Sequence, residues 1–397
     1  MKIAKISLAA LVALGAFSTV ASATPLEEAI KNVDLSGYAR YRYNNITVKK
    51  NNGEKDNTTA HHQFKSEFSF KAALDDNFCG VLSLRYNAKD SSAHNADGNK
   101  DNTNTTSTFN VKEFYLGYKV GNTTITAGKQ TVGSFFTDDV VGTGLRVTNQ
   151  DITGLTLAAI AFDALENGSE TDNGLPDAVR NAAFAENLYG VAAIGSYDPV
   201  SFQLWYASLI DIVNLIAADV NLSFNVSDDI SLGAQIQYGH ADIDNKVGPD
   251  FKDTDFYATE LSAEIFGADL AAGYIGYKVH DKAAGLVTLE DQGSFIEVGE
   301  IKSALDYTAL EGRGSFWFLK AGYTFAEKFK IDGDYSNGKV KDAKGDKEKY
   351  QEYVARLTYA YSAKLKFSSF YAYEINKHQD NSKDKTKQLR FQAKYTF

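Results

Sequence analysis

The side chains that could do chemistry in this sequence are scattered and do not form a known catalytic pattern. No G-x-S-x-G, Walker A or H-E-x-x-H segment occurs. The segment 242–253 begins like an EF-hand calcium loop, but Val247 stands where a glycine is needed and Asp253 where a bidentate Glu is expected. The histidines fall in predicted loops or at strand ends: His61, His62, His94, His240, His280 and His378. The sequence therefore predicts no enzyme.

Five arginines have spacings that place their charges on one face of a strand. In "SGYARYRYNN", Arg40 and Arg42 alternate with aromatic or small residues and so share a face. The same parity applies to Arg85, Arg146 and Arg356. An arginine on the lipid face of a barrel near the bilayer midplane costs about 2–4 kcal/mol. We expect these five to line a polar, wet lumen, where they serve a channel or pair with inward carboxylates.

The elements that must position these charges are strands with one apolar and one polar face. Apolar residues recur at every second position in 64–74, 220–226, 230–238, 329–336, 353–361 and 365–374. The last residues, "KQLRFQAKYTF", repeat the pattern and end on Phe397. Such rows of Phe, Tyr and Leu would aggregate in water, whereas a closed barrel in a membrane requires them. We predict an all-β, transmembrane antiparallel β-barrel with Phe397 at the periplasmic rim.

The connections alternate in length, as they do in outer-membrane barrels. Short turns are predicted at 75–77, 121–122, 198–200, 227–229, 326–328 and 362–364. Longer outer loops are predicted at 44–63, 88–108, 131–140, 164–186, 210–217, 241–254, 281–311, 337–349 and 376–387. We expect about 18 strands from near Leu35 to Phe397, joined by nine outer loops and eight turns. The even count places both termini on the periplasmic side.

The N-terminus and the composition agree with export. Residues 1–23 combine Lys2 and Lys5, an apolar run and a small-residue cleavage site, which is typical of a signal peptide. We expect the remaining residues, 24–397, to form one outer-membrane β-barrel domain, because they contain no linker and no shift in composition. Its net charge of −12, against −10 for the whole chain, argues against nucleic acid as a partner. With Cys79 alone, no disulfide forms within the chain.

Several segments resemble one known family. They are 24–43 ("TPLEEAIKNVDLSGYARYRY"), 127–130 ("AGKQ"), 141–147 ("VGTGLRV"), 152–163 ("ITGLTLAAIAFD"), 187–198 ("NLYGVAAIGSYD"), 289–293 ("LEDQG") and the final aromatic strand. Together they are similar to the major outer membrane porins of the Campylobacter type, over essentially the whole chain. The resemblance implies an integral outer-membrane protein, a homotrimer of 18-stranded barrels that passes small hydrophilic solutes and prefers cations.

The resemblance also implies a calcium ion at the constriction, held by acidic side chains of loops folded into the lumen. Glu290 resembles one ligand, and Asp138 or Asp139 a second, although their loop is several residues shorter than the family's. Asp163, Glu170 and Asp172 compete for the third place. The predicted metal ligands are Asp139, Asp163 and Glu290. The predicted acidic constriction is Asp138, Asp139, Glu170, Asp172, Glu290 and Asp291.

These loops would set the narrowest point of the pore, where electric fields are least screened. We therefore expect their acids to outweigh the wall arginines and the pore to favour cations moderately. The expected partners are outer-membrane lipid, lipopolysaccharide, small hydrophilic solutes and cations. Two alternatives stay open: a substrate-selective channel, if long loops plug the lumen, and a surface adhesin that uses loops such as 88–108 and 281–311.

Overall fold

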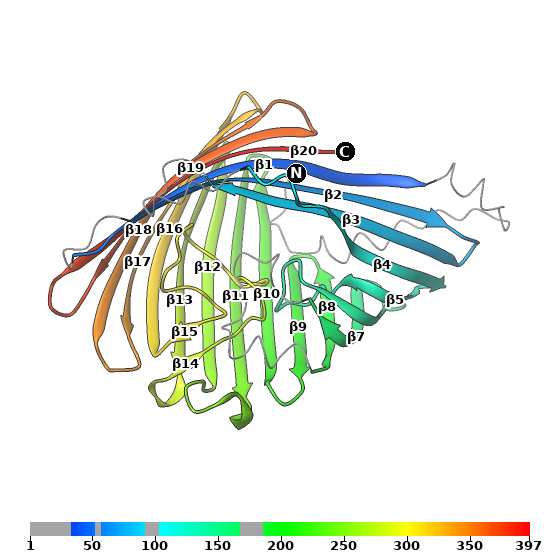
Figure 1. Ribbon diagram of the computed structural model, residues 1–397, viewed down its shortest axis with the longest axis horizontal. Coiled ribbons are helices and arrows are strands. Elements are labelled where there is room, and N and C mark those ends of the chain that lie inside the picture. The colour runs from blue at the N-terminus through cyan, green and yellow to red at the C-terminus, as the bar shows by residue number, and fades with distance from the viewer. Residues whose placement is uncertain (1–32, 52–56, 92–102, 167–185) are drawn as a thin grey trace.

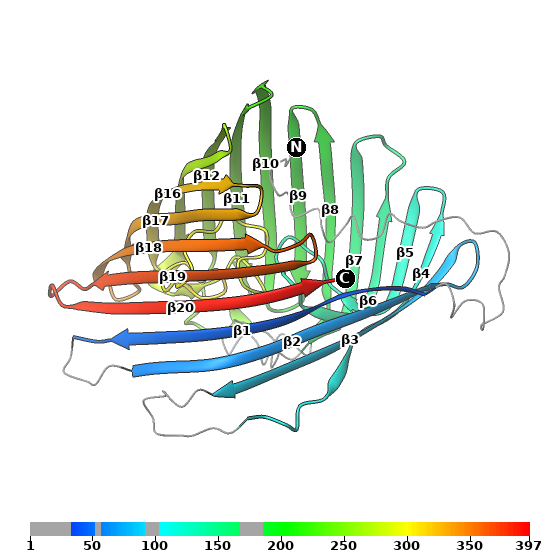
Figure 2. The same ribbon diagram turned by 90° about the horizontal axis from the view of Figure 1, so that it is seen from above.

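The chain forms one closed antiparallel β-barrel (Figures 1 and 2). The computed structural model describes residues 33–51, 57–91, 103–166 and 186–397. The sheet has 18 strands and closes where β20 pairs with β1, which confirms the predicted fold. Among these described residues, no helix is both long and apolar enough to cross a membrane. The predicted signal peptide lies outside the described residues.

The strands follow one another around the barrel in chain order. The first nine are β1 (Asp34–Lys49), β2 (Asn57–Ala73), β3 (Phe78–Ser91), β4 (Phe109–Val120), β5 (Thr123–Thr131), β6 (Val141–Asn149), β7 (Leu155–Leu165), β8 (Leu188–Tyr197) and β9 (Val200–Leu209). The others are β10 (Val213–Ser227), β11 (Ile230–Ile243), β12 (Thr254–Ile265), β13 (Ala268–Val279), β16 (Arg313–Phe325), β17 (Phe329–Lys341), β18 (Lys347–Ala360), β19 (Leu365–Lys377) and β20 (Lys383–Thr396). Short β14 (Ala284–Gly285) and β15 (Leu310–Glu311) pair with each other between β13 and β16, and two 3-10 turns occupy Asn245–Val247 and His280–Lys282.

Several strands run further towards the outer loops than the sequence predicts. Only 342–346 of the predicted loop 337–349, and 378–382 of the predicted loop 376–387, lie outside strands. The polar residues at the ends of the flanking strands still pair across the sheet. Polar residues there break the alternation that identifies a strand, but they do not prevent backbone pairing. The short turns fall close to their predicted places, for example at 228–229 and 326–328.

The outward face is apolar and aromatic, as a lipid-facing surface must be. Exposed side chains on it include Leu204, Phe224, Ile236, Leu261, Trp317, Ile331, Tyr353, Tyr371 and Phe391. Phe397 exchanges two backbone hydrogen bonds with Gly37 at the start of β1. Its ring lies 5.6 Å from that of Phe68 and 5.9 Å from that of Tyr395. The terminal aromatic residue therefore seals the junction between the last strand and the first.

The inward face differs between the two sides of the barrel, which the sequence did not predict. From β7 to β13 many inward side chains are apolar and form one buried core, which includes Phe162, Leu188, Trp205, Leu209, Leu215, Phe256 and Ile275. Residues 132–140, here the first inner loop, and 286–309, the second inner loop, fold inward and cover it. Figure 2 shows the yellow segment with the second inner loop inside the barrel. Polar residues line the opposite wall, from β17 through β20 to β3, as the predicted polar lumen requires.

Candidate functional site: two inner loops and a charged wall

Aromatic packing seats the two inner loops on the wall and on each other. The Phe135 ring of the first loop lies 4.8 Å from the Phe295 ring of the second. Phe295 in turn lies 4.6 Å from Phe256 on β12. Such pairs contribute about 0.5–1.5 kcal/mol each beyond the area they bury. The loops are therefore a packed layer inside the barrel.

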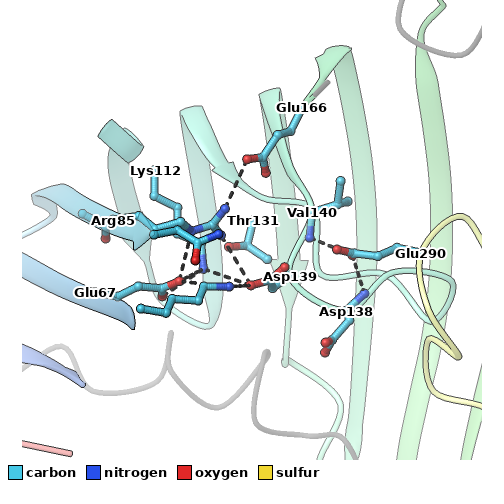
Figure 3. Close-up of polar contacts among 12 residues, drawn as sticks. Glu67, Arg85, Lys112, Thr131, Asp138, Asp139, Val140, Glu166 and Glu290 are labelled. Atoms are coloured by element: carbon cyan, nitrogen blue, oxygen red, sulfur yellow. Dashed lines mark hydrogen bonds and ion pairs between the residues drawn. The ribbon is translucent and has the colours of Figure 1, made fainter. Parts of the chain in front are cut away.

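Backbone hydrogen bonds and one carboxylate join the first inner loop to the second. The amides of Leu289 and Ser294 donate to the carbonyl oxygens of Phe136 and Phe135, both at 2.8 Å. The Glu290 Oε2 atom accepts from the amides of Asp138 and Val140, also both at 2.8 Å (Figure 3). Glu290 thus closes a latch between segments 150 residues apart.

A glycine makes the close approach of the loops possible. Gly293 adopts a left-handed φ of 52°, and a Cβ there would collide with the Phe135 carbonyl oxygen. Only glycine takes this conformation without strain. The "LEDQG" segment therefore supplies both the latch carboxylate and the turn that lets it reach its partners.

Burial changes the charge state of the latch. Burial of the carboxyl, together with the nearby Asp139 charge, raises the pKa of Glu290 to about 8, although the two amide donors oppose the shift. At neutral pH Glu290 is then largely protonated. It closes the latch but adds little negative charge to the constriction, in contrast to the prediction from sequence.

Asp139 lies at the centre of a charge network with the wall (Figure 3). Its carboxylate is 3.1 Å from Lys65 Nζ, 3.4 Å from Arg85 and 3.8 Å from Lys112. Arg85, only 3% exposed, also pairs with Glu67 and Glu166, both at 3.1 Å. Lys112 pairs with Glu67 at 3.0 Å. These side chains form an alternating cluster with equal numbers of acids and bases.

The cations of the network keep Asp139 ionised. Burial alone would raise the pKa of Asp139, but Lys65, Lys112 and Arg85 outweigh it and lower the pKa to about 2. Its negative charge is therefore fixed and largely neutralised by its partners. The first inner loop is tied to β2, β3 and β4 through this one side chain.

A second set of ion pairs and hydrogen bonds fixes the second inner loop to β17 and β18. Arg356 contacts Glu300 at 2.7 Å, and Asp332 and Asp334 at 3.3 and 2.7 Å. The Glu352 carboxylate accepts from the amides of Glu300 and Ile301 at 2.7 and 2.8 Å. Arg356 therefore points inward, as predicted, and its side chain anchors the second inner loop.

The other predicted arginines have different surroundings. The Arg40 guanidinium lies 3.4 Å from Gln63 Oε1, and Arg42 donates to Gln392 at 2.9 and 3.1 Å, so both face the polar wall. Arg146 also points inward, but it is 8% exposed and donates to the carbonyls of Thr131 and Val132. It does not line the lumen as predicted, because the first inner loop covers it.

Of the three predicted calcium ligands, Glu290 and Asp139 lie close together, since Glu290 accepts from the amides on either side of Asp139. Asp163 is an exposed residue of β7, at a register shift against β6, next to the inward and buried Phe162. Glu170 and Asp172 lie outside the described residues. Asp291 follows Glu290 in the second inner loop, and its carbonyl accepts from Thr288 at 2.7 Å. In the described ranges, no group of three or more His, Cys, Asp or Glu side chains could hold a metal ion. Calcium binding at the constriction stays a prediction.

Sequence reasoning missed most partners in the network. Lys65 and Glu67 stand on the polar face of the predicted strand 64–74, so parity alone could have singled them out. Lys112 and Glu166 could not be found this way. Lys112 falls at a register shift between β3 and β4, and Glu166 follows the end of β7. Nor does any local pattern show that Glu352 binds loop amides.

Comparisons with known proteins support the membrane assignment. The family described as Campylobacter major outer membrane protein matches residues 1–397. No match was found among curated proteins. Solved structures with a similar fold include Acinetobacter baumannii OccAB2, with 14% identity and a TM-score of 0.70 over 92% of this chain and 98% of that one. Pseudomonas aeruginosa OpdQ has 13% identity and a TM-score of 0.70 over 93% and 99%. Pseudomonas aeruginosa OccK7 (OpdD) has 14% identity and a TM-score of 0.68 over 91% and 99%. At these identities the likeness concerns the fold alone.

Proposed function

The chain belongs to the Campylobacter major outer membrane protein family, and we propose that it forms a water-filled channel for passive diffusion of ions and small hydrophilic solutes. Membership makes it an integral outer-membrane protein and a porin-like channel rather than an enzyme. We further propose which solutes pass through the channel, which ions it prefers and how the subunits assemble.

One observation carries the proposal: the inner loops occupy one side of the barrel and leave a polar wall on the other. That wall runs from β17 to β3 and presents Asp332, Arg356, Ser368, Arg390, Gln392, Arg42, Asn44, Gln63 and Ser83. Polar side chains would not be retained on the inside of a membrane barrel without water or partners to satisfy them. A loop layer facing such a wall is the arrangement of a narrowed aqueous pore.

The proposed cation preference rests on acids of the inner loops that reach solvent. The wall cations neutralise Asp139, and Glu290 is largely protonated, so neither carries the preference. Asp138 is exposed, and Glu297 has a side chain that is 58% exposed beside Lys302. We expect Asp138→Asn to reduce the preference more than Asp139→Asn, because Asp138 forms no ion pair among the described residues, whereas Lys65, Arg85 and Lys112 surround Asp139.

A row of cations on the wall favours a second candidate, a channel selective for anionic solutes. Lys366, Lys394, Arg40 and Lys65 are directly opposite one another across β19, β20, β1 and β2. Only Lys65 forms an ion pair among the described residues. Lys394 lies 4.5 Å from the centre of the Tyr38 ring. Such a row would attract carboxylate or phosphate groups on their way through the lumen.

The proposed homotrimer would use the outer face of β7 to β9. Small side chains, Ala159, Ala161 and Ala193, take outward positions there beside Leu157 and Val191. Small residues let backbones of neighbouring barrels approach closely. Lipid and lipopolysaccharide would then contact the rest of the outer surface.

Swelling of liposomes that contain the purified protein tests the channel proposal. We expect neutral sugars to enter at rates that fall smoothly with molecular size and do not saturate. Entry of small anions at a saturable rate, with exclusion of neutral sugars, would favour the anion-selective channel instead. Absence of swelling with every solute would contradict both and leave a surface-binding role.

A further inference from the structure

Charged residues on the outer face of the barrel are unevenly distributed. On β13 and β16 to β20, every outward charged residue is a cation, and all lie at the end of the barrel opposite the termini. These residues, here the outer cation belt, are Lys278, Arg313, Lys339, Lys341, Lys347, Lys349, Lys377, Lys383, Lys385 and Lys387. Their outward orientation follows from strict alternation with exposed Trp317, Tyr353, Tyr371 and Leu389 further along the same strands.

Strand pairing arranges the belt in rows across the sheet. In one row, Lys278 pairs with Arg313, Arg313 with Lys341, and Lys341 with Lys347. A second row joins Lys339, Lys349, Lys377 and Lys383 in the same way. Like charges directly opposite on neighbouring strands destabilise a sheet. An anionic partner that binds these two rows of cations would offset their mutual repulsion.

The protein itself supplies no such partner in the ranges that the structure describes. None of the belt residues forms an ion pair there, and no Asp or Glu takes an outward position on these strands. Lys387 contacts only the face of the Tyr373 ring, at 6.0 Å. By contrast, inward lysines such as Lys320 and Lys330 pair with carboxylates at 2.8 and 2.6 Å.

The belt stands just above an aromatic girdle, which fixes its depth in the membrane. Trp317, Tyr335, Tyr353 and Tyr373 face outward on β16 to β19, four residues before or after a belt residue on the same strand. Four residues of strand span about 13 Å. Aromatic rings of barrels mark the level of the lipid headgroups. The belt therefore lies at and beyond the headgroups of the outer leaflet.

The opposite side of the barrel provides an internal comparison. Strands β7 to β12 contain no Lys or Arg, and their outward charged residues are Asp163, Asp242 and Asp255. Asp255 is engaged by His240 and His280, both at 2.9 Å. A general need for solubility or for correct insertion would place cations around the whole rim. Elsewhere the outward cations are single, such as Lys129 on β5, so the concentration of ten on β13 and β16 to β20 indicates a specific partner on that side.

We propose that the outer cation belt binds the phosphate groups of lipopolysaccharide in the outer leaflet of the outer membrane. Lysine ammonium groups bind phosphate as compact point charges, and rows of them match an array of phosphorylated headgroups rather than one small ion. The side without cations then faces neighbouring protein. This inference concerns the outer surface and stands or falls independently of which solutes pass through the lumen.

Binding of lipid A to the purified full-length protein in detergent tests the proposal. The probes are diphosphorylated lipid A, the same lipid after removal of its phosphates, and inorganic phosphate. The test variant changes Lys339, Lys349, Lys377 and Lys383 to Gln, which removes one row. We expect it to bind diphosphorylated lipid A at least about tenfold more weakly than the wild type, and added salt to weaken the wild-type complex. Dephosphorylated lipid A and inorganic phosphate should bind the wild type poorly.

Two controls separate a lost charge from a damaged fold. Lys328→Gln with Lys364→Gln removes exposed lysines from turns at the opposite end and should bind like the wild type. Replacement of the four row lysines by Arg should retain binding, because the charge is kept. Equal binding of lipid A by the Gln variant and the wild type would overturn the proposal. So would equal binding of dephosphorylated lipid A, or binding of inorganic phosphate at comparable affinity.

Discussion

Glu290 of the second inner loop holds the first inner loop in place. Its carboxyl accepts two amide hydrogen bonds from the first inner loop. A Glu290→Ala change leaves both amides without an acceptor in a buried place, which costs about 1–3 kcal/mol. We expect a lower unfolding temperature and noisier single-channel currents. Glu297→Ala, at an exposed position of the same loop, should change neither the unfolding temperature nor the noise in this way.

The stability that the latch gives the folded protein should also depend on pH, and the pKa of Glu290 determines whether stability rises or falls as the pH increases. Because its folded-state pKa is raised from 4.5 to about 8, the folded state holds the proton more tightly than the unfolded state. The stabilisation is present below pH 4.5 and is lost as the pH rises through about 8. We expect the unfolding temperature of the wild type to fall between pH 6 and pH 9. Glu290→Gln, which stays neutral, should lack this decrease, and an equal decrease in both would contradict the assignment.

Arg85 balances three carboxylates, so its removal should change both stability and selectivity. Arg85→Gln leaves Glu67, Asp139 and Glu166 with only Lys65 and Lys112. Breaking such a buried ion-pair network costs about 3–5 kcal/mol. The extra negative charge should shift the reversal potential in a KCl gradient towards potassium. Arg313→Gln, on the outer face of β16, is the matched control and should leave the reversal potential unchanged.

At the scale of elements, the inner loops behave as a layer held by aromatic contacts. Phe295 lies between Phe135 of the first loop and Phe256 of the wall. Phe295→Ala should cost about 3–5 kcal/mol and loosen both loops together, which proteolysis of the folded protein would detect as new cleavage within 286–309. Phe114→Ala removes a lipid-facing ring that is 68% exposed and should produce no new cleavage there. Unchanged cleavage of the Phe295 variant would contradict the packed-layer description.

The sequence predicts the strands well because alternation is a local property. It predicts the inner layer poorly because the latch and the aromatic cluster join residues far apart in the chain. A signal does exist in β7 to β10, whose residues are apolar on both faces, as in "LTLAAIAFDAL" and "NLIAADV". A strand that faces lipid on one side needs a second apolar face only if protein covers it inside the barrel. The pairing of Asp139 with Lys65 and Arg85 could not be predicted, since it depends on where the first loop comes to rest.

At the scale of the whole molecule, the outer surface has two sides with different chemistry. The outer cation belt occupies β13 and β16 to β20, and small residues occupy β7 to β9. If the second side joins the subunits, Ala159→Trp should convert a trimer into monomers in light scattering corrected for detergent. Ala355→Trp, at an outward position on β18, should leave the trimer intact. A wild-type protein that stays monomeric at every concentration would contradict the proposed assembly.

The central claim is that the inner loops narrow the barrel without closing it, and single-channel recording in planar bilayers tests this most directly. We predict open-channel currents that rise linearly with voltage, a conductance that increases with KCl concentration without saturating, and a reversal potential moderately displaced towards potassium in a salt gradient. A small conductance that saturates with salt, or the absence of currents from correctly folded protein, would contradict the account.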